Sequence, residues 1–278
     1  MARIIGEIGP NQTGTPCANP LIDLMLNYNE FGTGPTLLIA HGLYGSAKNW
    51  GVIAKRLSDT RRVITVDMRN HGDSPRFDTN SYPELANDLA EVIEHIGGPI
   101  DVLGHSMGGK AVMTLALTRP DLVRSLIVGD IAPVSYSHTQ AHFIDAMKAV
   151  DLSSVTRRSE ASAQLADLGV DAALQSFFTQ SLDLANKRWK LNFDALAADM
   201  DKILSFPTLK GTYDGPTLFL SGAESDYVTR EHRPVIKPLF PNERFAKIPQ
   251  AGHWLHAERP RAFEAAVRAY LDAVSQQT

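Results

Sequence analysis

Short apolar runs alternate with helical patterns along most of the chain. The runs lack a clean alternation of apolar and polar residues, which is typical of strands buried on both faces of a sheet. Between and after them, apolar residues recur at helical spacing in 85–96 and in 263–274. Such strand–helix units predict a doubly wound, mostly parallel α/β sheet. The strands are expected at 36–40, 63–66, 100–103, 122–128 and 217–220.

The stretch 134–210 has a different pattern. It lacks a strand-like run and contains several short helical patterns rich in Ala, Asp, Ser and Leu. We expect a helical cap here, inserted after the sixth strand, while residues 1–133 and 211–278 form the α/β core; an extra helical layer is the plainer alternative. The aromatic residues of this stretch either form its own packing core or line an acyl pocket. They are Phe177, Phe178, Trp189, Phe193 and Phe206.

The N-terminal residues predict neither a regular element nor a targeting signal. Residues 1–20 contain three glycines and three prolines, which interrupt helices and central strands, so we expect an irregular arm. Residues 1–10 lack the apolar segment of a secretory signal, and no apolar run approaches the roughly 20 residues that span a bilayer. The single cysteine, Cys17, cannot form a disulfide within the chain. This fits a reducing compartment, and a cytoplasmic protein is expected.

Length and charge exclude several classes of protein. A chain of 278 residues forms one large domain or two small ones, and it can bury enough apolar surface to fold without disulfides. Its net charge of −4 argues against a nucleic-acid partner, which requires positive charge opposite the phosphates. We find no residue spacing typical of zinc ligands and no phosphate-binding glycine loop, so neither a metal nor a cofactor is expected.

A candidate nucleophile lies where a predicted strand meets a predicted helix. The motif Gly-His-Ser-Met-Gly occupies 104–108, and G-x-S-x-G in this setting forms a nucleophile elbow. Small residues two positions before and after Ser106 allow a tight turn. The turn holds the serine hydroxyl above the sheet, near the positive end of the following helix. Ser106 is therefore the expected nucleophile.

A serine hydroxyl needs a base to remove its proton. In this fold the base is a histidine late in the chain, after the acid. His253 follows the strand-like residues 244–248 and precedes the last helix, so we favour it as the base. His256 is the alternative. Earlier histidines in recognisable loops, such as His105, are more typical of structural hydrogen bonds.

An oxyanion hole needs two N–H donors directed at the developing negative charge. One is expected to be the backbone N–H of Met107, the residue after the nucleophile. The other should come from the glycine-rich loop 41–46, which follows the first predicted strand. Glycines let the backbone of this loop approach a substrate closely. We expect Leu43 to supply this second N–H.

These motifs together resemble the α/β-hydrolase superfamily. The resemblance extends from about residue 24 to residue 275. The segment Arg-Asn-His-Gly at 69–72, combined with Ser-Met-Gly-Gly-Lys at 106–110, is similar to a subgroup of small esterases and thioesterases. That subgroup includes bacterial short-chain acyl esterases and the mitochondrial α/β-hydrolase-domain esterase.

The acid of a Ser-His-acid triad has two candidate positions. Most superfamily members place it in the loop after the seventh strand, where this chain has Ser225, with Asp226 one residue later. Asp130 ends the strand beside the nucleophile strand, and the resemblance to the esterase subgroup implies an acid there, supported by a serine in the later loop. A carboxylate at either position can orient the histidine and stabilise its cation. We favour Asp130 and keep Asp226 as the alternative.

The resemblance implies a serine esterase that acts on short- to medium-chain acyl or aryl esters. Thioesters are the alternative substrates. Ser106 argues against dehalogenases and epoxide hydrolases, which need an aspartate at this position. Carbon–carbon bond hydrolases, perhydrolases, the menaquinone-pathway lyase and hydrolase-fold ligand receptors keep the serine and remain alternatives, because a fold does not determine a substrate. A small-molecule ester is the expected partner. The sequence leaves the natural substrate and the oligomeric state open.

Overall fold

The computed structural model describes residues 24–137 and 139–276, and its centre is a seven-stranded sheet of order β1-β3-β2-β4-β5-β8-β9. Neighbouring strands are parallel except β1, which runs antiparallel to β3. The predicted doubly wound α/β fold is confirmed, and the five predicted runs overlap β2, β3, β4, β5 and β8. The strands are β1 Tyr28–Phe31, β2 Thr36–Ala40, β3 Arg62–Val66, β4 Ile100–His105, β5 Val123–Gly129, β8 Thr217–Gly222 and β9 Glu243–Ile248.

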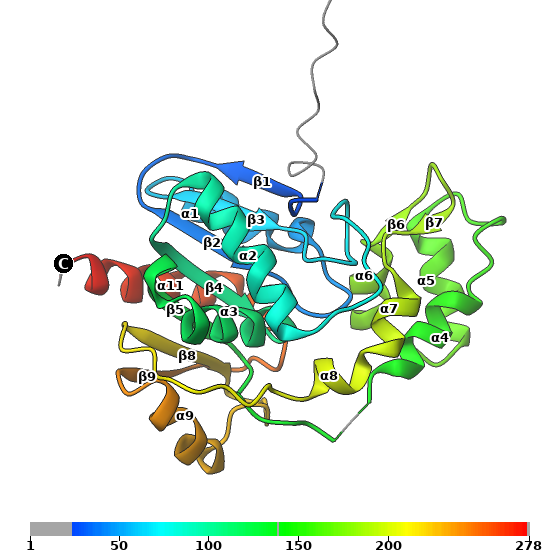
Figure 1. Ribbon diagram of the computed structural model, residues 1–278. Helices are drawn as coiled ribbons and strands as arrows, with labels where there is room; N and C mark the ends of the chain where they lie inside the picture. Colours follow the sequence, from blue (N-terminus) through cyan, green and yellow to red (C-terminus); the bar gives the residue numbers. More distant parts are fainter. Residues whose placement is uncertain (1–23, 138, 277–278) are drawn as a thin grey trace, which may run out of the picture.

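Helices cover both faces of this sheet (Figure 1). One apolar cluster packs helices α2 and α3 against the sheet, and a second packs α1 and α11 against the opposite face. Leu38 of β2 belongs to the first cluster and Leu37 to the second, and both are fully buried. Because both faces are covered, neither set of alternating side chains needs to be polar. The bounds are α1 Gly51–Leu57, α2 Tyr82–Ile96, α3 Met107–Thr118, α9 Arg233–Leu239, α10 Leu255–Glu258 and α11 Pro260–Ser275, with short 3-10 turns at Ala47–Trp50, Pro120–Leu122 and Arg230–His232.

Most regular elements of residues 134–210, the cap segment, are short helices, and they lie beside the sheet (Figure 1). Their insertion point follows β5, which is the fifth strand of the described chain rather than a sixth. They also contain a two-stranded antiparallel hairpin where the sequence predicted none, because strands of two residues are too short to show a period. The elements are α4 Ala141–Ala149, α5 Arg158–Asp167, α6 Ala172–Thr179, β6 Leu182–Asp183, β7 Arg188–Trp189, α7 Phe193–Ala198 and α8 Met200–Leu204.

The division into a core of 1–133 and 211–278 and a cap of 134–210 stays a prediction. The expected irregular arm and Cys17 lie outside the described residues. Among the residues that the structure describes, every helix is too short or too polar to cross a membrane.

The carboxyl ends of the parallel strands bring the candidate residues together. Ser106 follows β4, Asp130 follows β5 and His253 lies between β9 and α10, while loops follow β2 and β8 at the same edge. In open α/β sheets this edge is where ligands bind. The order of the strands thus determines which loops can meet.

Candidate active site

The nucleophile elbow is a backbone turn that needs glycine on both sides. Ser106 separates β4 from α3 and has a positive φ of 52°. A Cβ at Gly104 would lie 2.1 Å from the carbonyl oxygen of Gly108, and one at Gly108 would lie 2.4 Å from the carbonyl oxygen of Ala40. Real side chains cannot approach backbone atoms this closely, so the turn excludes larger residues. The strained serine is held at the start of α3, as the motif predicted.

His253 connects Ser106 to Asp130. Its Nε2 lies 3.1 Å from Ser106 Oγ, and its Nδ1 lies 2.8 Å from Asp130 Oδ2. The acceptor at Nδ1 is a carboxylate, so Nδ1 carries the proton and Nε2 accepts from the serine hydroxyl. Asp130 is fully buried, with a positive φ of 50° that turns it back from the end of β5. The three side chains therefore form a continuous hydrogen-bonded chain.

The later loop supports Asp130 and does not supply the carboxylate. The Ser225 hydroxyl donates to Asp130 Oδ2 at 2.5 Å, and the backbone N–H of Gly222 donates to Asp130 Oδ1 at 3.0 Å. Asp226 and Glu224 are exposed to solvent. The loop thus contributes two hydrogen-bond donors to the buried carboxyl group of Asp130.

His105 and His256, two further histidines near the site, are buried as neutral rings. His105 Nε2 donates to the backbone carbonyl of His253 at 2.7 Å, which ties the histidine loop to the elbow. His256 stacks on Trp50 with ring centroids 4.1 Å apart. Burial lowers the pKa of His105 well below its usual value and that of His256 to about 3. His256 does not contact Ser106 through any hydrogen bond among the described residues.

The loop after β2 places Leu43 beside Ser106. Both Leu43 and Met107 are buried, and no acceptor within the described residues takes either backbone N–H. Tyr44, which follows Leu43, has a φ of 64°, and its N–H donates to His71 Nε2 at 3.2 Å. His71 Nδ1 in turn donates to the carbonyl of Arg69 at 2.8 Å. Burial lowers the pKa of His71 to about 3, so the neutral ring can accept this bond.

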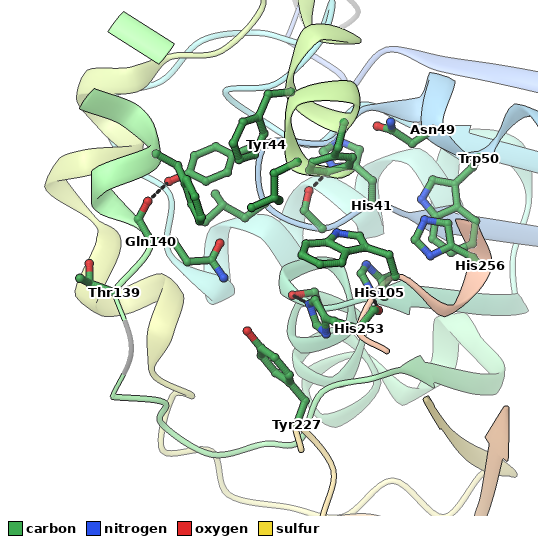
Figure 2. A pocket seen from close by; sticks show the side chains of 18 of the residues that line it. His41, Tyr44, Asn49, Trp50, His105, Thr139, Gln140, Tyr227, His253 and His256 are labelled. Carbon is green, nitrogen blue, oxygen red and sulfur yellow. Dashed lines mark hydrogen bonds between the residues drawn. The ribbon is translucent and has the colours of Figure 1, made fainter. Parts of the chain in front are cut away.

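Two cavities of very different size meet at Ser106. The larger, of about 380 Å³, is mostly apolar and is shown in Figure 2. The smaller, of about 30 Å³, lies on the side of Met107. The larger volume falls in the range of ligand pockets, of the order of 300–1,000 Å³.

The two expectations for the aromatic residues of the cap segment each hold in part. Phe177 and Phe178 line the larger cavity, whereas Trp189 and Phe193 pack against each other.

Sequence reasoning missed several residues of the larger cavity. Tyr227 stacks on the His253 ring with centroids 4.0 Å apart and lies beside it in Figure 2. Gln140 and His142 of the cap segment also line the cavity. Only the place of Tyr227, two residues after Ser225, is a signal that could have identified it.

Within residues 24–137 and 139–276, no group of three or more His, Cys, Asp or Glu side chains could hold a metal ion.

Comparisons with known proteins agree on the family. A family model described as alpha/beta hydrolase fold matches residues 35–260. The sn-1-specific diacylglycerol lipase ABHD11 of Mus musculus is 42% identical over 263 residues, which cover 89% of this chain and 85% of that protein. Esterase YbfF of Escherichia coli (strain K12) is 37% identical over 250 residues, which cover 88% of this chain and 95% of that protein.

A solved structure gives the same result. A protein described as a marine microorganism esterase aligns with a TM-score of 0.84 and 38% identity, over 89% of this chain and 99% of that one. The expected resemblance is confirmed, and the names of these proteins agree with the expected class of enzyme, a carboxylic ester hydrolase. On this evidence the chain belongs to the α/β-hydrolase fold family.

Proposed function

We propose that this protein is a serine esterase with Ser106 as nucleophile, His253 as base and Asp130 as acid. The observation that carries the proposal is the unbroken chain of contacts from Ser106 Oγ through the imidazole to a buried carboxylate. The backbone N–H groups of Leu43 and Met107 form the oxyanion hole in this proposal. Both adjoin Ser106 and have no acceptor among the described residues.

The proposed reaction has two halves. His253 Nε2 takes the proton of Ser106 as Oγ bonds to the ester carbonyl carbon, and the carbonyl electron pair moves to the oxygen held by the two N–H groups. His253 then gives that proton to the leaving oxygen as its bond to carbon breaks. A water molecule attacks the acyl-enzyme in the same way, which releases the acid and restores Ser106.

The proposed substrates are short- to medium-chain acyl or aryl esters, with thioesters included in the test. A mostly apolar cavity of about 380 Å³ supports a compact substrate. The names of three relatives indicate related reactions. They are a diacylglycerol lipase, an esterase and, at 30% identity in Saccharomyces cerevisiae, a probable alcohol acetyltransferase. All three names imply transfer of an acyl group from or to an alcohol.

The test is turnover of soluble p-nitrophenyl esters by the wild-type protein and by Ser106→Ala. We expect many cycles per wild-type molecule, almost none in Ser106→Ala, and covalent labelling of Ser106 by a fluorophosphonate. Ser176→Ala on α6 is the matched control, because Ser176 is exposed and should not affect the rate. A single turnover followed by a stable complex would instead indicate a ligand receptor, and full activity of Ser106→Ala would exclude the proposed nucleophile.

A further inference from the structure

The two cavities at Ser106 share some walls and differ in others. Leu43, Ser106, Gln140 and Tyr227 line both of them. His253 is among the residues that line the larger cavity and is absent from those that line the smaller one. The two spaces thus lie on different sides of the nucleophile, and the base faces the larger one.

The position of the base assigns the two halves of an ester, if the proposed function is correct. In the tetrahedral intermediate, the carbonyl carbon carries Ser106 Oγ, the oxyanion, the acyl chain and the leaving oxygen. The leaving oxygen must receive its proton from His253 Nε2, so it lies on the side of the larger cavity. The oxyanion occupies the site between the two N–H groups. The direction that remains for the acyl chain points into the smaller cavity.

The smaller cavity holds very little. About 30 Å³ of it is open to a water-sized molecule, against about 380 Å³ in the larger cavity, so it accepts a much smaller group. Ile131, Ile203 and Leu204 form its apolar walls. We expect an acetyl or propionyl chain to fit this space, and a longer chain to meet the side chains that line it.

Hydrogen bonds fix the wall contributed by the cap segment. The Tyr82 hydroxyl donates to the carbonyl of Ile203 at 2.6 Å. Lys110 Nζ donates to the carbonyls of Leu204 and Ser205 at 2.8 and 2.7 Å. Lys110 is itself buried, so moving this wall would leave its buried Nζ without these two acceptors. A buried donor without an acceptor is unfavourable, so these bonds hold the wall in place and the cavity resists widening.

We infer that the smaller cavity is the acyl site, and that the enzyme cleaves acetyl and propionyl esters of larger, apolar alcohols. The acyl limit is set by Ile203 and its neighbours. The alcohol is selected by the larger cavity, whose lining includes Leu174 and Phe177. This inference rests on the proposed function, narrows its acyl groups to acetyl and propionyl, and adds which half of the ester each cavity receives.

Two substrate series separate the two cavities. The first keeps p-nitrophenol as the leaving group and lengthens the acyl chain from acetate to hexanoate. The second keeps the acetyl group and enlarges the alcohol through ethyl, hexyl and 2-naphthyl acetate. For the wild-type enzyme we expect kcat/KM to fall about 10-fold for each methylene beyond propionate, which is the cost of overpacking a rigid site. We expect it to rise along the second series.

Matched variants then enlarge one cavity at a time. Ile203→Ala should raise kcat/KM for butanoate and pentanoate at least 10-fold and leave the dependence of kcat/KM on alcohol size unchanged. Leu174→Ala should alter the alcohol series and leave the dependence of kcat/KM on acyl-chain length unchanged. If Ile203→Ala does not fold, Ile203→Val should give a smaller change in the same direction.

Three results would overturn the assignment. One is a wild-type enzyme that accepts hexanoate as well as acetate, and another is an acyl range that lengthens in Leu174→Ala. The third is an acyl range that stays unchanged in both Ile203 variants. Absence of Ser106-dependent hydrolysis for every ester would instead disprove the proposed esterase function itself, so the two failures are distinguishable.

Discussion

The triad and the oxyanion loop lie side by side, yet they are held by different parts of the chain. Ser106, Asp130 and His253 contact one another and loops at the edge of the sheet. The loop 41–46 is hydrogen-bonded to His71, which follows β3, and also to the cap segment. The comparison shows that the hydrogen bonds of the triad are made outside the cap segment, whereas the loop 41–46 is also bonded to the cap segment and depends on how it docks.

Tyr44 shows this dependence most directly. Its N–H donates to the ring of His71. Its carbonyl accepts from the Ser181 hydroxyl at 2.9 Å, and its own hydroxyl donates to the carbonyl of Gln140, also at 2.9 Å. The first partner belongs to the core, and the other two belong to the cap segment. Leu43 directly precedes Tyr44, so the direction of the Leu43 N–H follows from both contacts.

The largest effect is expected from the triad carboxylate. Asp130→Asn keeps the shape and removes the charge, so the tautomer and the cation of His253 lose their support. In serine proteases the corresponding change lowers turnover by about 10⁴-fold, and we expect a loss of this order in kcat. Asp226→Asn is the matched control, because Asp226 is exposed; it should retain most activity. A crippled Asp226→Asn with an active Asp130→Asn would reverse the assignment.

A smaller loss is expected at Ser225, which donates one hydrogen bond to Asp130. A hydrogen bond to a charged group contributes about 1.5–3 kcal/mol, so Ser225→Ala should lower kcat roughly 10- to 100-fold. Ser225→Thr keeps the hydroxyl and should recover part of the rate. Equal losses in both variants would show that shape, and not the hydrogen bond, matters at this position.

The sequence predicts the triad better than the loop, and the reason is physical. Ser106 and His253 are identified by local motifs next to strands, and the carboxyl ends of parallel strands must share one edge. The choice between Asp130 and Asp226 depends on backbone direction: a φ of 50° turns Asp130 inward, and a local sequence pattern does not encode that angle.

The contacts of Tyr44 lie beyond any local pattern. Ser181 and Tyr44 are 137 residues apart, and they meet only because the cap segment docks on this edge of the sheet. The Arg-Asn-His-Gly segment is recognisable as a motif in the sequence. Only the structure shows its physical role, in which the neutral ring of His71 accepts a hydrogen bond from the Tyr44 N–H. Likewise the two cavities are shaped by side chains from distant elements, which composition and periodicity cannot place.

Acid should weaken the support of the oxyanion loop through His71. Its pKa is lowered by burial to about 3, whereas an unfolded histidine titrates near 6.5. Between these values the unfolded state binds more protons, so stability falls as the pH falls, by about 1.4 kcal/mol per pH unit for one such group. The free energy of unfolding, measured by urea titration from pH 7 to pH 4, checks this.

His71→Gln separates this effect from the other titrating groups. The variant lacks the ring that must take up a proton, so its stability should depend less steeply on pH, although it is less stable at pH 7. The pKa of His256 is lowered to about 3 as well. This histidine should therefore still contribute to the pH dependence of stability in the variant. An unchanged slope in His71→Gln would contradict the assignment of a buried, neutral His71.

The smallest effect tests the comparison most directly, because Ser181 lies in the cap segment and lines neither cavity. Ser181→Ala removes the hydrogen bond from the cap segment to the Tyr44 carbonyl, a neutral bond worth about 0.5–1.5 kcal/mol. If the cap orients the Leu43 N–H, kcat should fall roughly 2- to 10-fold with little change in KM, because oxyanion donors act mainly on the transition state. Labelling by a fluorophosphonate should slow in parallel, and Ser176→Ala, an exposed change in the same segment, should do neither. A raised KM with an unchanged kcat would mean that the cap shapes only the substrate cavity, and the oxyanion loop would then depend on the core as the triad does.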